Sequence, residues 1–299
     1  MDLRALRYFV ETVRHNSFTL AADSLCVTQS TVSKMIRQLE NEVGQPLLLR
    51  EGRQLRLTDA GRLVFERAQQ ALGVMRELTR ELGDLTTLAR GELTVGLPPM
   101  ANLLFSPAVK AFRERHPGIS LSLKESGGQV IEQQVASGEL EIGVTLLPAD
   151  PALGLAARSF GRFPIHAVGM RGAPWAASPT VDLAALQAEP LVLLSDDFSL
   201  TRQLRGAFRA IGVAPRIVAQ SSQWDFLVAM AAAGLGTTFM PAPLLDRLKL
   251  GGELAARPLT NTGIDWNVAL VHTPGRYLSH AARAWQQVCE DVLATPAVS

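Results

Sequence analysis

The sequence predicts an α/β protein with a small helical N-terminal domain, one long helix and a larger C-terminal region of alternating strands and helices. Residues 17–50 encode two short amphipathic helices and the start of a hairpin. Residues 64–85 carry apolar side chains at heptad spacing, and strand and helix patterns alternate from residue 93 onward. A chain of 299 residues is long enough for two or three domains, each with its own core.

The second helix of the first pair has two chemically different faces. At about 100° per residue, its apolar side chains fall together on one side and small polar or basic side chains lie opposite. Thr28 precedes this helix and can cap its free N–H groups, as Ser17 or Thr19 can for the helix before it. The apolar face comprises Val32, Ile36, Leu39 and Val43, and the polar face comprises Ser30, Ser33, Lys34, Arg37 and Asn41.

The preceding short helix carries small residues where the two helices would meet. Ala21 and Ala22 permit the close approach that a helix-turn-helix requires, and Cys26 is expected as a small buried residue in the turn. By spacing alone, an ordinary amphipathic pair in a globular core remains the alternative. A supporting first helix is predicted upstream, with an inner face formed by Leu3, Leu6, Phe9, Val10 and Val13.

A hairpin pattern follows these helices and favours a DNA-binding domain over an ordinary amphipathic helix pair. Residues 47–50 and 54–57 are strand-like and flank Gly52, which predicts a wing of two short strands. Arg50, Arg53 and Arg56 would lie on or beside this wing, where they suit phosphates or a minor groove. Taken singly, each arginine fits an ordinary solvated surface charge better than a DNA contact.

Together, residues 1–90 resemble the DNA-binding domain and linker helix of LysR-type transcriptional regulators, and the segment order extends the resemblance over the chain. Leu48 departs from the family, which usually carries Phe there; this should alter packing beneath the wing. The matching residues are Phe9, Ser17, Ala21, Ala22, Leu25, Thr28, Gln29, Ser30, Val32, Ser33, Ile36, Leu39, Glu40, Gly44, Leu47, Arg50, Leu57, Thr58 and Gly61. The resemblance implies DNA contacts from Thr28, Gln29, Ser30, Thr31, Ser33, Lys34, Arg37, Arg50, Arg53 and Arg56.

Composition is consistent with a cytoplasmic protein that needs no cofactor. Neither a signal peptide nor a membrane-spanning apolar run is visible, and Cys26 and Cys289 are too few for a disulfide framework or a zinc site. Residues 1–90 hold 13 Lys and Arg against 11 Asp and Glu, so this domain is not strongly basic. Binding to promoter DNA must therefore depend on where the cations lie and on dimerisation.

A long helix is predicted after the wing, and it carries an apolar heptad seam that favours dimerisation. Thr58 and Asp59 suit its first turn, and apolar residues then recur at alternating spacings of four and three over about three heptads. An intramolecular helix pair is the alternative, whereas the resemblance implies an antiparallel dimer and, for the whole protein, a homotetramer built as a dimer of dimers. The seam comprises Val64, Ala68, Ala71, Met75, Leu78, Leu82 and Leu85.

The remaining residues predict a mostly parallel sheet with helices on both faces. We divide the chain into domains 1–58, 59–90 and 91–299, and the last resembles the two-lobed periplasmic-binding-protein fold, with crossings near 161–164 and 262–267. Lobe I is then 92–162 with 266–299, and lobe II is 163–265. Strands are expected at 93–97, 119–124, 140–144, 191–194, 216–219, 237–240 and 266–271, and helices at 101–115, 128–137, 200–211, 224–233, 242–248 and 279–293.

Ligands of open parallel sheets bind beyond the carboxyl ends of strands, near helix N-termini. The segment 98–101 offers no hydroxyl, where the family commonly anchors its effector with Ser or Thr, but the backbone N–H groups of Met100 to Asn102 remain as donors. We expect a small-molecule effector, an organic anion for preference. The candidate contacts are Pro99, Met100, Ala101, Ser126, Thr145, Phe198, Ser199, Thr201, Ser221, Trp224 and Thr238.

The expected function is therefore a transcription regulator whose promoter binding, DNA bending and contact with RNA polymerase respond to an effector. Two other classes share the two-lobed fold. An enzyme would need a nucleophile with its base, a phosphate loop or a metal cluster, and the sequence shows no such linear motif. A solute-binding transport component would need export and would have no use for a DNA-probing helix.

Overall fold

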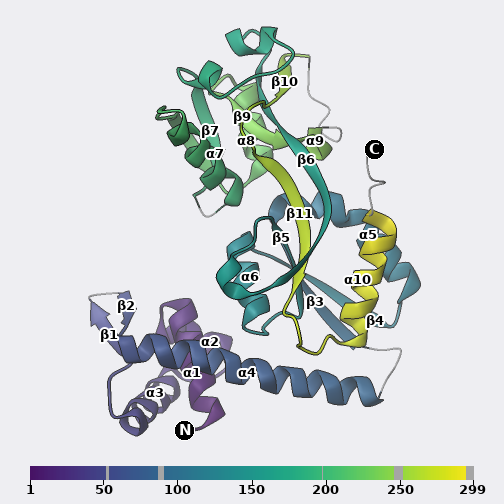
Figure 1. Ribbon diagram of the computed structural model, residues 1–299. Coiled ribbons are helices and arrows are strands. Elements are labelled where there is room, and N and C mark those ends of the chain that lie inside the picture. The colour runs from purple at the N-terminus through teal and green to yellow at the C-terminus, as the bar shows by residue number, and fades with distance from the viewer. Residues whose placement is uncertain (52–53, 87–90, 197, 246–251, 294–299) are drawn as a thin grey trace. The chain divides into compact units, whose positions relative to one another are not determined.

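The computed structural model of the protein describes residues 1–51, 54–86, 91–196, 198–245 and 252–293 (Figure 1). The chain forms two compact units, one consisting of Met1–Thr86 with Ser137–Glu139 and the other of the rest of the chain. Each unit buries an apolar core of its own. Among the described residues, no helix combines the length and the apolar character that a membrane span requires.

The N-terminal unit is a winged helix-turn-helix followed by one long helix (Figure 1). The wing strands are antiparallel, with Leu48 opposite Leu57, as the hairpin pattern predicts. This part of the predicted fold is confirmed. The elements are α1 (Leu3–His15), α2 (Phe18–Ser24), α3 (Gln29–Val43), β1 (Leu48–Glu51), β2 (Gln54–Leu57) and α4 (Asp59–Thr86).

Hydroxyl side chains begin the helices where the sequence places them. The Oγ1 atoms of Thr28 and Thr58 accept hydrogen bonds from backbone N–H groups of the first turns of α3 and α4, at 3.3 and 2.9 Å. Ser17, rather than Thr19, caps α2: its Oγ accepts a hydrogen bond from the backbone N–H of Leu20 at 3.3 Å. Each cap satisfies one N–H that the helix itself leaves without a partner.

The core of this unit is the predicted apolar face, with two corrections. Val32, Ile36 and Leu39 are buried. Leu3, expected on the inner face of α1, is 41% exposed because it is the first residue of the helix and projects beyond the core. Cys26, expected to be buried, is exposed: it adopts a left-handed conformation with φ of 54°, which turns its side chain toward solvent.

The long helix α4 changes its environment along its length. Its first half lies in the core of its own unit, where Val64, Ala68 and Leu72 belong to the cluster formed with α1 and α3. Its second half presents Met75, Leu78 and Leu82, which are between 42 and 55% exposed. The predicted seam is therefore divided, because its first residues pack inside the same chain.

The second unit contains the predicted alternation of strands and helices. We call lobe I the elements β3 (Gly91–Leu97), α5 (Asn102–Arg115), β4 (Ile119–Glu125), α6 (Gly128–Ala136), β5 (Ile142–Leu146), β11 (Asp265–His272) and α10 (His280–Leu293). Lobe II comprises β7 (Pro190–Leu194), α7 (Ser199–Ala210), β8 (Arg216–Ser221), α8 (Trp224–Ala232), β9 (Thr238–Pro241), α9 (Ala242–Leu245) and β10 (Leu254–Pro258).

One long strand, β6 (Ala156–Met170), pairs in both lobes (Figure 1). Its first part lies beside β11, and its second part lies between β9 and β10. The large sheet has the order β10-β6-β11-β5-β3-β4, and β7 and β8 form a separate parallel pair. At this first crossing the chain therefore passes between the lobes within a strand rather than through a loop.

The expectation of a mostly parallel sheet is wrong. β3 is parallel to β4 and β5, but β11 is antiparallel to β5 and β6, and β6 is antiparallel to β9 and β10. The sheet is mixed because β11 runs antiparallel to β5, and because β6 and β10, neither of which was expected, add further antiparallel pairs. Arg158, Gly161 and Pro164 interrupt the apolar pattern of β6, so its sequence is typical of a linker.

Candidate DNA-binding and effector-binding sites

The exposed side of α3 carries the predicted polar side chains together. Lys34, Arg37 and Asn41 are exposed, opposite the buried Val32 and Ile36. The amphipathic pattern therefore places the polar side chains on the surface that α3 does not pack against the core. A shallow open hollow runs along this surface, which we call the recognition face; it is lined by Gln29, Ser30, Ser33, Lys34, Arg37, Gln38 and Asn41.

Hydroxyl groups cluster at the N-terminus of α3. Thr28 Oγ1 lies 2.9 Å from Ser30 Oγ and 2.8 Å from Thr31 Oγ1, in addition to its capping bond. Thr28 thus has a structural role as the cap, whereas Ser30 and Thr31 are exposed at the first turn. A helix N-terminus with exposed hydroxyls and N–H groups suits a phosphate oxygen.

The wing, formed by β1 and β2, follows α3 in the chain, and the predicted arginines fall on or beside it. Arg56 is exposed on β2. The backbone of Arg50 lies in β1, opposite Leu55, while its side chain and Arg53 lie outside the part of the chain that the structure describes.

Two side chains attach the wing to the helices, and the sequence analysis did not identify this role for either. Glu40 of α3 accepts hydrogen bonds from the backbone N–H groups of Leu47 and Leu48, at 2.8 and 3.3 Å. Asn16, which ends α1, accepts one from the backbone N–H of Leu55 at 2.9 Å. Glu40 belongs to the family pattern, which was a usable signal, whereas nothing local to Asn16 indicates a partner 39 residues away.

In lobe I, some of the candidate effector residues already donate hydrogen bonds within the protein. Thr145 is buried, and its hydroxyl donates to Glu132 Oε1 at 2.5 Å. The N–H of Ala101, expected as a donor for a carboxylate, instead donates to the Pro98 carbonyl at 2.9 Å and closes a 3-10 turn. Met100 is also buried, which leaves Pro99 and Ser126 as the half-buried candidates of this lobe.

Ser126 and the candidates of lobe II differ in what their hydroxyls already do. Ser126 donates to the carbonyl of its neighbour Glu125 at 2.7 Å. The oxygens of Ser199 and Ser221 instead accept, from Gln203 Nε2 at 2.9 Å and from the Gln223 N–H at 3.1 Å. A hydroxyl that accepts keeps its own hydrogen available for a ligand.

The other lobe II candidates divide into buried and half-buried side chains. Thr201 is buried and donates to the Leu194 carbonyl at 2.9 Å. Thr238 is fully buried, and its hydroxyl has no hydrogen-bond partner among the described residues. Phe198 and Trp224 are half-buried against the core, at the start of α7 and of α8. Both remain candidates for the apolar wall of an effector site.

The described parts of the chain contain no cluster of His, Cys, Asp and Glu side chains that would suit a metal ion. Fold and surfaces define the class of protein: a winged helix-turn-helix with a polar recognition face, followed by a two-lobed domain with strands and helices arranged as in ligand-binding proteins.

Comparison with known protein families gives the same class over the whole chain. Residues 3–62 match the family described as bacterial regulatory helix-turn-helix protein, lysR family, and residues 86–294 match the LysR substrate binding domain. The uncharacterized HTH-type transcriptional regulator YwbI of Bacillus subtilis (strain 168) is 36% identical over 297 residues, covering 99% of this chain and 98% of that protein. The chain belongs to the LysR family of transcriptional regulators.

Another curated relative and two solved structures are also similar to this chain over nearly its whole length. The nitrogen assimilation regulatory protein nac of Klebsiella aerogenes is 29% identical, covering 93% of this chain and 87% of that protein. The crystal structure of the LysR family regulator CbnR superposes with a TM-score of 0.64 at 21% identity, over 99% of this chain and 100% of that one. The crystal structure of full-length CbnR complexed with its target DNA superposes with a TM-score of 0.61 at 20% identity, over 98% of this chain and 99% of that one. These structures support the fold.

Proposed function

We propose that this regulator reads promoter DNA by placing the recognition face of α3 in the major groove. The observation that carries the proposal is the separation of faces on α3, with Lys34 and Arg37 exposed directly opposite buried Val32 and Ile36. Arginine and lysine make the commonest specific base contacts in that groove, and serine and glutamine supply further donors and acceptors. The proposed contacts are Gln29, Ser30, Ser33, Lys34 and Arg37 to bases and adjacent phosphates, and Thr28 and Thr31 at the helix N-terminus.

The wing is proposed to contact the sugar-phosphate backbone or a minor groove through Arg50, Arg53 and Arg56. The observation that supports this is Arg56, which is exposed on β2. Such contacts set the register and the affinity rather than the sequence preference.

Arg37→Ala tests the recognition face. With a duplex that the protein itself selects from a random-sequence pool, we expect affinity to fall about 10- to 100-fold, the cost of one good bidentate contact. Arg113→Ala, which removes an exposed arginine of α5, is the matched control and should bind normally. If Arg37→Ala selects and binds the same duplexes as the wild-type chain with the same affinity, the recognition face is assigned wrongly.

We propose further that a small organic anion binds between the lobes and acts as the effector. Ser199, at the start of α7, and Ser221, at the end of β8, support this, because both keep a hydroxyl hydrogen to donate. Phe198 and Trp224 lie nearby in sequence and would be apolar partners of the ligand. Pro99 and Ser126 would contribute from lobe I.

Ser199→Ala tests the effector proposal. A panel of organic acids is screened by thermal shift, where a ligand at 100 times its Kd adds about 2.7 kcal/mol. We expect any acid that stabilises the wild-type chain to stabilise Ser199→Ala less, while duplex binding without the acid is unchanged. An equal shift in both chains would remove Ser199 from the site.

The proposed mechanism joins the two sites through the oligomer. Exposed Met75, Leu78 and Leu82 would pair two chains along α4, and two such dimers would form a tetramer that holds DNA bent. Effector binding would change the lobe geometry, the bend and the contact with RNA polymerase. The protein would act in the cytoplasm by binding alone, without a catalytic step.

A further inference from the structure

Asn16 connects the end of α1 with the wing. It is the C-cap residue of α1 and adopts the left-handed conformation, with φ of 48° and ψ of 30°. Its side-chain Oδ1 accepts a hydrogen bond from the backbone N–H of Leu55 in β2, at 2.9 Å. Asparagine is one of the few residues that enter the left-handed region readily, so one residue both ends the helix and supplies the acceptor.

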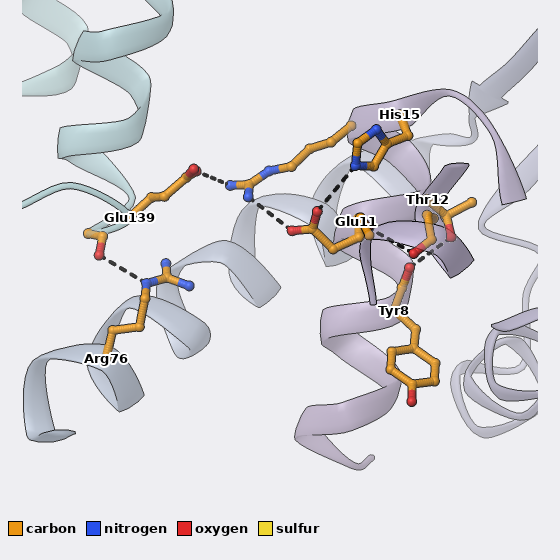
Figure 2. A network of polar contacts seen from close by, with 10 residues as sticks. Tyr8, Glu11, Thr12, His15, Arg76 and Glu139 are labelled. Carbon is orange, nitrogen blue, oxygen red and sulfur yellow. Dashed lines mark hydrogen bonds and ion pairs between the residues drawn. The ribbon is translucent and has the colours of Figure 1, made fainter. Parts of the chain in front are cut away.

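The end of α1 that carries Asn16 is held in place. The backbone N–H of Asn16 donates to the carbonyl groups of Thr12 and Val13. Thr12 is buried, and its hydroxyl donates to the carbonyl of Tyr8 at 2.8 Å, as Figure 2 shows. On the same turn, Glu11 accepts from Arg14 at 3.1 Å and lies 3.7 Å from His15 Nε2. The position of the Asn16 acceptor is therefore set by the helix and not by a mobile loop.

The hydrogen bond reaches the edge of β2 that faces away from β1. β1 pairs with β2 along one edge, and the Leu55 N–H points to the other, where Asn16 meets it. An isolated two-stranded hairpin is marginally stable, so its position depends on such attachments. Arg56 follows Leu55 directly, and fixing the backbone of Leu55 fixes where the Arg56 side chain leaves the strand.

We infer that Asn16 is a positioning residue for DNA binding: it holds the wing where Arg56 meets the duplex, without touching DNA itself. This inference rests on the wing contacts proposed above. Glu40 fixes the base of the wing at Leu47 and Leu48, whereas Asn16 fixes β2. Without Asn16, the wing would have to be ordered when DNA binds, and part of the binding free energy would be lost.

Asn16→Gly isolates the hydrogen bond, because glycine adopts the left-handed conformation without strain and keeps the helix cap. We expect faster hydrogen exchange at the Leu55 amide and about fivefold weaker binding of the selected duplex, the equivalent of one hydrogen bond. The slope of log K against log salt should become shallower, as it does when a phosphate contact is lost. Asn261→Gly is the matched control, since Asn261 is exposed, has a φ of 57° and lies in the other unit.

A double-mutant cycle with Arg56→Ala then decides whether Asn16 acts through the wing. If it does, Asn16→Gly weakens binding in the wild-type chain but has little further effect in Arg56→Ala. The inference is overturned if Asn16→Gly leaves hydrogen exchange at the Leu55 amide or the duplex affinity unchanged. It is also overturned if the losses of binding free energy in the two single variants add up in the double variant. Normal binding by Arg56→Ala, with fast Leu55 exchange in Asn16→Gly, would instead overturn the proposed Arg56 contact and the DNA role of Asn16 while leaving the attachment itself intact.

Discussion

The carboxylate of Glu40 accepts a hydrogen bond from the backbone N–H of Leu47, with 2.8 Å between Oε1 and the nitrogen. Glu40 lies in α3 and Leu47 directly before β1, so one side chain joins α3 to the wing. Leu47 itself is fully buried. A charged acceptor at this point satisfies a backbone group that is removed from water.

Replacing Glu40 by Ala should destabilise the N-terminal unit by about 1–3 kcal/mol, because two backbone N–H groups lose their acceptor. All four tryptophans lie from Trp175 onward, in the other unit. We therefore expect urea to remove part of the helical circular dichroism earlier than in the wild-type chain, while the tryptophan fluorescence transition stays in place. Glu40→Gln, which keeps an oxygen acceptor, should destabilise the N-terminal unit less. Coincident curves for Glu40→Ala and wild type would contradict this role.

The exposed stripe on α4 should determine the oligomeric state. Leu78→Glu places a charge in the middle of Met75, Leu78 and Leu82, where burying it against a second chain would be costly. We expect smaller species in sedimentation velocity and weaker duplex binding. Leu63→Glu is the control, because Leu63 is exposed on the same helix but outside the heptad seam. An unchanged sedimentation coefficient for Leu78→Glu would show that the chains associate elsewhere.

Thr145 should act on stability rather than on effector binding. Thr145→Val keeps the shape of the side chain but leaves the buried Glu132 carboxylate without its hydroxyl donor. The expected loss is about 1–3 kcal/mol, seen as an earlier tryptophan fluorescence transition in urea. Thr94→Val changes an exposed threonine of β3 and should be close to neutral. Equal transitions for the two variants would argue against the Thr145–Glu132 contact.

The two cysteines should react very differently. Burial raises the pKa of the Cys289 thiol, so the reactive thiolate is scarce at neutral pH, whereas Cys26 is exposed. A chromogenic disulfide reagent should titrate one thiol in the native protein and both in denaturant. Cys26→Ser should remove the native reaction altogether. Rapid reaction of Cys289 in the folded chain would mean that α10 opens readily.

Much of the site follows from local patterns. The recognition face was predictable because burying Val32, Ile36 and Leu39 on one side of a helix forces Lys34 and Arg37 onto the other. Effector residues were harder, because a position at the end of a strand does not reveal which groups are already bonded. Thr145 and Thr201 are both buried with their hydroxyl hydrogens in use.

The sequence by itself determined the helix-turn-helix, its caps, the wing and the alternation of strands and helices apart from β6 and β10, since each of these depends on residues close together in the chain. Tertiary structure alone decided the path of β6 through both lobes, the division of α4 and the attachment of the wing by Asn16. Those features arise from pairing between residues far apart in sequence. Asn16 and Leu55 are separated by 39 residues, and no local pattern of side chains encodes a hydrogen bond to a distant backbone N–H.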